Sequence, residues 1–141
     1  MLSEALLSGL IHDVALVVGH RNHRFVEPAL GNRLGGALLA ADMTIGFSQI
    51  GSESGWRAAE TTLTKQQAEK RGIDLKFADA QQKQENQIKA IRGFIAQGVD
   101  AILLAPVVAT GWDEVLEEAK DAEIPVVLLD RTVDAPEDLY L

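Results

Sequence analysis

Short apolar runs alternate with amphipathic stretches along residues 42–141, and this alternation predicts alternating strands and helices. Runs with the composition of strands cover residues 44–48, 73–77, 101–104 and 126–129. Residues 101–104 are wholly apolar, which is typical of a strand covered on both faces. Strands joined in this order by right-handed helical crossovers form one parallel sheet. The expected fold class is therefore α/β, a doubly wound parallel sheet.

Capping signals set the expected helix ends. Ser54 is expected to cap the first helix and Gly72 to terminate it, and Gly98 is expected to end a second helix over residues 84–97. Thr110 is the expected cap of a third helix. The expected buried face of the first helix holds Trp56, Ala59 and Leu63, with Ala68 as a further candidate. The expected buried faces of the other two helices hold Ile88, Ile91 and Ile95, and Val115, Leu116 and Ala119, respectively.

Residues 1–41 do not share this pattern, and the chain is expected to divide into a leader-like segment, 1–41, and a core, 42–141. Residues 34–41 form a short apolar run rich in small residues, as at the end of a secretory signal with a mature start near Ala41 or Asp42. The segment also carries acidic residues and is longer than the usual leader of about 15–30 residues. We therefore expect a degenerate or mis-started leader, poorly structured and separate from the core.

Composition excludes several classes of function. The chain has 141 residues, no cysteine and a net charge of −8. The missing thiols exclude cysteine catalysis and cysteine-based zinc sites. The acidic balance opposes nucleic acid as a partner, because proteins that bind polyanions are basic. No apolar run approaches the roughly 20 residues that a membrane-spanning helix needs.

Three kinds of catalytic or cofactor site are disfavoured by the residues present. His20 and His23 could share one side of a helix, but neither cysteine nor carboxylates at ligand spacing accompany them. The glycines in Gly46-x4-Gly51-x3-Gly55 match no phosphate-binding motif. Residues 42–141 contain no histidine to serve as base for a serine nucleophile. We expect no enzyme activity, no metal and no cofactor.

Two polar segments are expected to meet at the carboxyl edge of the sheet, where ligands of such sheets bind. The first is Glu53, Ser54, Gly55, Trp56 and Arg57, after the first strand, and the second is Asp130 and Arg131, after the fourth. An aromatic ring packs on the C–H face of a sugar, and carboxylate and guanidinium groups bond its hydroxyls. The alternative is that Trp56 belongs to the core and that Asp130 and Arg131 form a local ion pair.

The sequence resembles the type I periplasmic sugar-binding proteins of bacterial ABC importers. The resemblance rests on residues 44–60, 81–88, 98–102 and 124–131 and covers about residues 42–141. Two segments are specific to fewer members of the family and are similar to the galactofuranose-binding subfamily. They are Gly51-Ser52-Glu53-Ser54-Gly55-Trp56-Arg57 and residues 105–112. Ala105 stands where many ribose-type relatives carry an asparagine, which also agrees with that subfamily.

The resemblance implies a non-catalytic periplasmic receptor in which two lobes close on a monosaccharide and then dock on membrane permease subunits. The sugar contacts of the family fall on Glu53, Ser54, Gly55, Trp56 and Arg57, and on Asp130 and Arg131. Family members are longer than this chain, which corresponds to most of an N-terminal lobe.

An alternative with the same fold is the effector domain of a sugar-responsive repressor. Such a protein needs a basic helix-turn-helix ahead of the core. Residues 1–41 contain three arginines, no lysine and three acidic residues, and they show no such motif. The sequence therefore favours the importer over the repressor.

Overall fold

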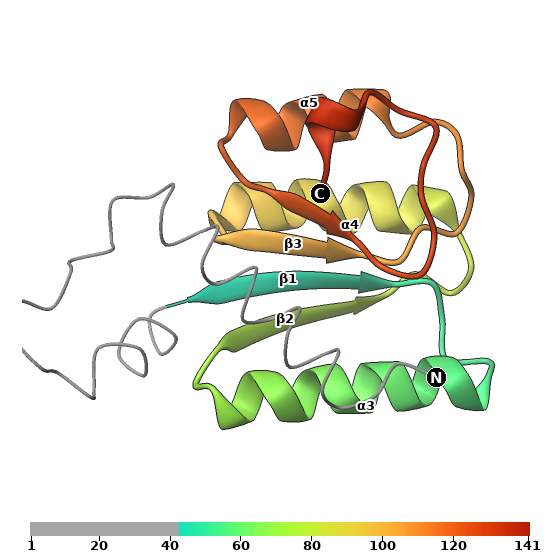
Figure 1. The fold of residues 1–141 in the computed structure, drawn as a ribbon, viewed down its shortest axis with the longest axis vertical. Coiled ribbons are helices and arrows are strands. Elements are labelled where there is room, and N and C mark those ends of the chain that lie inside the picture. The colour runs from blue at the N-terminus through green and yellow to red at the C-terminus, as the bar shows by residue number, and fades with distance from the viewer. Residues whose placement is uncertain (1–42) are drawn as a thin grey trace, which may run out of the picture.

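A four-stranded parallel sheet forms the centre of the molecule (Figure 1). The computed structural model describes residues 43–141, so the expected leader lies outside the described part. The strand order is β2-β1-β3-β4. The strands are β1 (Thr44–Gln49), β2 (Asp74–Asp79), β3 (Ala101–Leu104) and β4 (Val126–Leu128), and the helices between them are α3 (Gly55–Lys70), α4 (Gln84–Gln97) and α5 (Asp113–Asp121). The doubly wound α/β fold expected from the sequence is confirmed.

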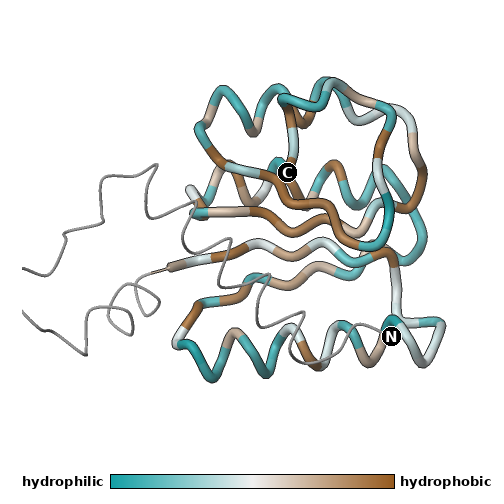
Figure 2. Tube along the Cα trace, in the orientation of Figure 1, coloured by the Kyte–Doolittle hydropathy of each residue, from teal (hydrophilic) through white to brown (hydrophobic). Residues whose placement is uncertain are grey.

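The helices divide between the two faces of the sheet (Figure 1). Helix α3 packs beside β2 and contributes Ala68 to a core cluster with Ile45, Phe47 and Leu103. Helices α4 and α5 pack together over the other face, where Ile91 and Leu116 join a second cluster. Figure 2 shows the most hydrophobic stretches in β3 and β4, as expected of strands inside a layered α/β core.

A close approach of helix to strand fixes the position of α4. The ring of Phe94 lies against Gly46 in β1 so closely that a Cβ built on this glycine would stand 2.5 Å from the ring carbons. Real contacts at this separation do not occur, so only glycine permits this packing. Strand β1 pairs in parallel with β2 on one side and with β3 on the other, so its carboxyl end lies between theirs. This is the edge of the sheet at which such folds bind ligands.

Helix α3 turns a different face to the sheet from the one that the sequence predicted. Trp56 and Leu63 are only partly buried and Ala59 is exposed. The buried positions are largely polar: Arg57, Glu60, Thr64, Gln67 and Ala68. Of the expected stripe only Ala68 is buried. The rest is wrong, because hydrogen bonds satisfy polar side chains that the hydrophobic pattern assigns to solvent.

The helix ends confirm most of the capping predictions. The side chain of Ser54 accepts a hydrogen bond from the Arg57 amide, and Gly72 and Gly98 adopt the left-handed conformation after α3 and α4. Thr110 does not cap α5, which begins at Asp113 with Trp112 at the cap position and no capping side chain. The side chain of Trp112 is fully buried instead and donates from its indole nitrogen to the carbonyl of Val108.

The two edges of the described sheet differ in polarity. Strand β2 carries exposed Asp74, Lys76 and Asp79, with Lys76 and Asp74 paired at 3.1 Å. Strand β4 is apolar, and its outer side receives the backbone of Leu141, which donates to Val126 and accepts from Leu128. Among residues 43–141 no helix is long and apolar enough to cross a membrane.

Candidate functional site

The turn between β1 and α3 presents the first polar segment at the carboxyl edge of the sheet. Ser54 caps α3, so Gly55, Trp56 and Arg57 form its first turn. Ser54 and Gly55 are exposed, and nothing lies within 4 Å of a Cβ built on Gly55. This leaves open space in front of the helix end, in which a ligand can approach the backbone.

The guanidinium of Arg57 joins the two predicted segments. Its side chain is 10% exposed and extends over the edge, so that Nη2 lies 3.6 Å from Oδ2 of Asp130 and Nε lies 3.8 Å from Oε1 of Glu53. Both separations exceed the length of a good hydrogen bond. Because a guanidinium has five N–H donors, these loose ion pairs leave donors available to a hydroxyl-bearing ligand.

Asp130 and Arg131 form a tight turn directly after β4. The amide of Arg131 donates to the carbonyl of Leu129 over three residues, and Asp130 in between has a φ of +69°. This left-handed conformation is unfavourable for a residue with a Cβ, although aspartate tolerates it better than most. The turn directs the Asp130 carboxylate toward Arg57, while the side chain of Arg131 remains 57% exposed and 3.8 Å from Asp130.

Trp56 and Glu53 complete the first segment. The guanidinium carbon of Arg57 lies 5.5 Å from the centre of the Trp56 ring, within the range of a cation–π contact. Glu53 folds back over Gly51, where an added Cβ would meet its Oε2 at 2.1 Å. The structure thus brings Glu53, Trp56, Arg57 and Asp130 together, with Arg131 at the margin. Trp56 is not part of the core cluster, contrary to the alternative interpretation of the sequence.

A buried polar pair beneath Arg57 escaped the sequence analysis. Gln49 is fully buried at the end of β1, and Glu60 is 3% exposed on α3. Gln49 Nε2 donates to Glu60 Oε2 over 3.0 Å, and Gln49 Oε1 accepts from Arg57 Nη1 over 3.4 Å. The spacing of the polar residues 57, 60, 64 and 67 along one side of a helix was the available signal.

Burial controls the ionisation of Glu60, the titratable member of this pair. Removal of the Glu60 carboxyl from water raises its pKa, and the nearby charge of Asp130 acts in the same direction. The hydrogen bond from Gln49 and the charge of Arg57 oppose this rise and are weaker. Oε1 of Glu60 has no hydrogen-bond partner in the described part of the chain.

The segment after β3 forms the floor between the two polar segments and is held by α4. The Gln87 amide donates to the carbonyl of Ala105 over 2.7 Å and accepts from the amide of Val107 over 2.9 Å. Gln84 donates to the carbonyl of Thr110 over 2.6 Å. These bonds fix the loop without placing a polar side chain at position 105.

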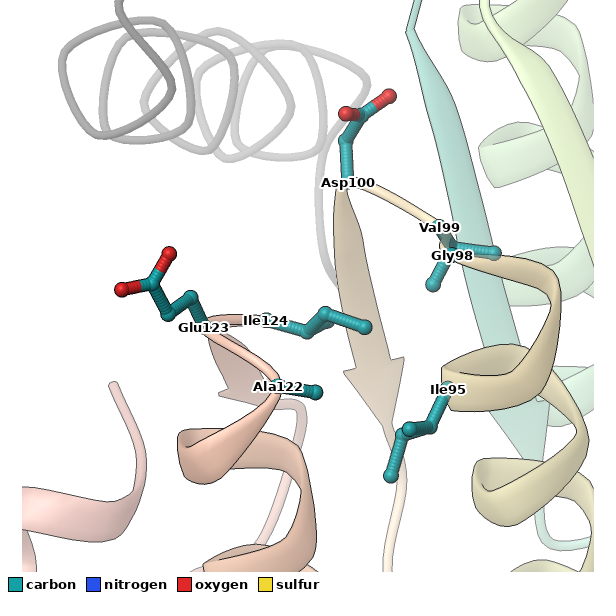
Figure 3. A pocket seen from close by; sticks show the side chains of 7 residues that line it. All are labelled: Ile95, Gly98, Val99, Asp100, Ala122, Glu123 and Ile124. Carbon is teal, nitrogen blue, oxygen red and sulfur yellow. The ribbon is translucent and has the colours of Figure 1, made fainter.

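A cavity of about 290 Å³ lies at the opposite edge of the sheet, between the ends of α4 and α5 (Figure 3). Asp100, Glu123 and Ile124 help to line it. In Figure 3 both carboxylates turn away from the apolar side chains of Ile95 and Ala122. It contains none of the predicted site residues and lies at the amino ends of β3 and β4, away from the edge at which such sheets bind ligands.

The described residues show no gathering of three histidine, cysteine, aspartate or glutamate side chains that could hold a metal. His20 and His23 lie outside residues 43–141. The carboxyl edge itself presents an aromatic ring, two carboxylates and two guanidinium groups, which suit a neutral polyhydroxyl ligand.

Known proteins with similar sequences bind sugars. The galactofuranose-binding protein YtfQ of Escherichia coli (strain K12) is 67% identical over 117 residues, which are 82% of this chain and 37% of that protein. A crystal structure of a galactofuranose binding protein superposes with a TM-score of 0.68 at 73% identity, covering 70% of this chain and 33% of the other. The periplasmic binding protein component of the arabinose ABC transporter from Shewanella sp. ANA-3, bound to α- and β-L-arabinofuranose, gives a TM-score of 0.69 at 66% identity over the same shares.

These matches cover most of this chain but only about a third of each relative. The family match also covers most of this chain, because residues 45–141 fit the sequence profile of the periplasmic binding protein domain. The parallel sheet with its flanking helices and the family profile agree. The chain therefore belongs to the periplasmic binding protein family.

Proposed function

We propose that residues 42–141 form one sugar-binding lobe of the receptor of a bacterial ABC importer, and that its ligand is a furanose, galactofuranose in the first place. The observation that carries this proposal is the convergence of Arg57 with Asp130, 3.6 Å apart at the carboxyl edge of the sheet. The similar proteins agree with such a ligand, since they bind galactofuranose or arabinofuranose.

Each predicted site residue has a role in this proposal. Trp56 packs its ring on the C–H face of the sugar. Arg57 and Arg131 donate to ring and hydroxyl oxygens, and Asp130 accepts from a pair of hydroxyls. Glu53 accepts from a further hydroxyl, and Ser54 and Gly55 present the capped end of α3. The role is binding without catalysis, and neither metal nor cofactor takes part.

Ring size provides the direct test of the sugar class. Galactose in water supplies a small amount of the furanose in equilibrium with the pyranose, whereas methyl galactopyranoside is locked in the six-membered ring. We expect galactose, and not the locked glycoside, to shift the NMR signals of Trp56 and Arg57. Equal responses to both sugars would contradict the furanose assignment, and no response to either would contradict sugar binding by this lobe.

The cellular setting belongs to the same proposal. We infer a periplasmic receptor whose closed form docks on membrane permease subunits, with residues 1–41 acting as a leader outside the lobe. Expression in a Gram-negative host, followed by fractionation and N-terminal sequencing, tests this. The expected result is a periplasmic protein that begins near Ala41 or Asp42, and a cytoplasmic protein that begins at Met1 or Leu2 would contradict it.

A further inference from the structure

The side-chain amide of Gln49 has one allowed orientation. Its oxygen accepts from the amide of Ile50 over 2.9 Å and from Arg57 Nη1 over 3.4 Å. Its nitrogen donates to Glu60 Oε2 over 3.0 Å and to Thr61 Oγ1 over 3.4 Å. If the amide were turned over, its NH₂ group would face two donors and its oxygen a carboxylate, so the network itself fixes the orientation.

Glu60 makes this orientation strict while its carboxyl group is ionised, because an ionised carboxylate only accepts hydrogen bonds. It lies one turn after Arg57 on α3 and is 3% exposed. The charged groups that face it are Arg57 on the same helix and Asp130 after β4. Placed at the back of Gln49, the carboxylate draws the NH₂ group toward itself and so presents the Gln49 oxygen to Arg57.

Arg57 depends on that oxygen for its position. Its contacts with Glu53 and Asp130 are 3.8 Å and 3.6 Å long, and the bond to Gln49 is the shortest of the three. A long arginine side chain with loose partners samples several rotamers, and ordering it on binding costs free energy. A buried acceptor behind the guanidinium reduces that cost before the ligand arrives.

We propose that Gln49 and Glu60 are positioning residues: Glu60 orients the Gln49 amide, and Gln49 holds the guanidinium of Arg57 toward the sugar. This inference rests on the proposed function, since it assigns a purpose to the position of Arg57. Neither residue is expected to touch the sugar, because both lie beneath Arg57 and are buried.

The test uses the 141-residue chain and two NMR readouts. The first is the mobility of the Arg57 Nε–H group without sugar. The second is a galactose titration up to about 0.5 M, because only a small part of galactose is furanose and the chain alone is expected to bind that form no more tightly than about 1 mM. The variants are Gln49→Met, which keeps the shape and loses the amide, Glu60→Ala, and the conservative Glu60→Gln, which keeps an acceptor for Gln49. The matched control is Thr64→Ala, because Thr64 is buried one turn later on the same face and bonds only within α3.

In Gln49→Met and Glu60→Ala we expect a mobile Arg57 and affinity about tenfold weaker, the effect of losing one hydrogen bond to a charged group. Glu60→Gln should recover most of both, and combining Gln49→Met with Glu60→Ala should weaken binding no further than either alone. Thr64→Ala should lower the melting temperature and leave both readouts unchanged.

The inference is overturned if Arg57 stays ordered and the affinity stays constant in Gln49→Met, or if Thr64→Ala produces the same losses. A wild-type chain that does not respond to galactose would instead overturn the proposed function. The mobility of Arg57 would still show whether Gln49 holds it, because that readout needs no sugar.

Discussion

Arg57 connects the parts of the carboxyl edge that lie far apart in the sequence. It begins in the first turn of α3, reaches Asp130 beyond β4 and rests on Gln49 at the end of β1. Because its side chain is largely buried, its charge is poorly solvated and depends on these neighbours. Changes to single residues around it should therefore affect binding more than their number of contacts suggests.

Loss of the ring at position 56 or of the carboxylate at position 130 should each weaken sugar binding by about 2 kcal/mol or more. Trp56→Ala removes the stacking surface, and Asp130→Ala leaves sugar hydroxyls unpaired. Calorimetry can measure this in a chimera that joins this lobe to the remainder of the E. coli galactofuranose-binding protein. The control is Asp134→Ala, a change to an exposed aspartate nearby, and unchanged affinity in Trp56→Ala would remove Trp56 from the site.

Glu60 should make the stability of the lobe depend on pH. Because its folded pKa is raised, the folded state takes up the proton more readily than the unfolded state. The stabilisation is complete below the unfolded pKa of about 4.3 and is lost as the pH rises through the folded pKa. Relative to wild type, Glu60→Gln should therefore gain stability as the pH rises from about 4, as measured by urea unfolding at a series of pH values.

Glu118 is only partly exposed and provides a control whose stability should change with pH in the opposite direction. The hydrogen bond from Arg92 lowers the pKa of Glu118, so its contribution is present above the unfolded pKa and is lost as the pH falls. Glu118→Gln should lose stability relative to wild type as the pH rises through that window. Parallel pH profiles for the two variants would show that burial does not govern Glu60.

At the scale of elements, the sequence predicted most accurately what local rules determine. Helix α4 and strand β3 have the predicted bounds, because Gly98 and a wholly apolar run mark them. The buried face of α3 was wrong, since periodicity assigns polar residues to solvent and cannot register a hydrogen-bonded partner such as Gln49. The convergence of Arg57 with Asp130 followed from topology, but the pair of Gln49 with Glu60 did not. The spacing of polar residues marks a polar face on α3, and no spacing rule links that face to the strand end that carries Gln49.

The contact between α4 and β1 leads to an opposed pair of glycine substitutions. Gly46→Ala should destabilise the lobe by about 1–3 kcal/mol, because the new methyl group overlaps the Phe94 ring. Gly93→Ala, in the middle of α4 with nothing within 4 Å, should stabilise it by about 0.5–1 kcal/mol. Chemical denaturation measures both, and Gly46→Ala combined with Phe94→Leu should recover part of the loss.

At the scale of the molecule, residues 43–141 form one wall of the proposed sugar site, and the family resemblance implies a second wall from another lobe. A sugar on an open wall keeps part of its hydroxyls in water, and the loss of freedom on binding offsets the stacking on Trp56. A second wall that contributes about 4 kcal/mol would change the affinity about a thousandfold. The lobe alone is therefore expected to bind its ligand only weakly.

The 141-residue chain alone should accordingly bind galactofuranose no more tightly than about 1 mM, against micromolar for the chimera. With about 0.1 mM sugar, the chimera should gain about 2.7 kcal/mol of stability and the isolated chain almost none. Thermal unfolding with and without sugar distinguishes the two. A clear rise in the melting temperature of the isolated chain would mean that one lobe suffices.

The unequal edges of the sheet limit how copies of this chain can assemble. Edge strand β2 opposes pairing through its alternating charges, whereas β4 already accepts a backbone partner in Leu141. A filament needs two adhesive edges for each molecule, and the described sheet offers at most one, because Leu141 occupies outward-facing backbone groups of β4. Concentrated solutions of the chain should therefore not form open-ended fibres.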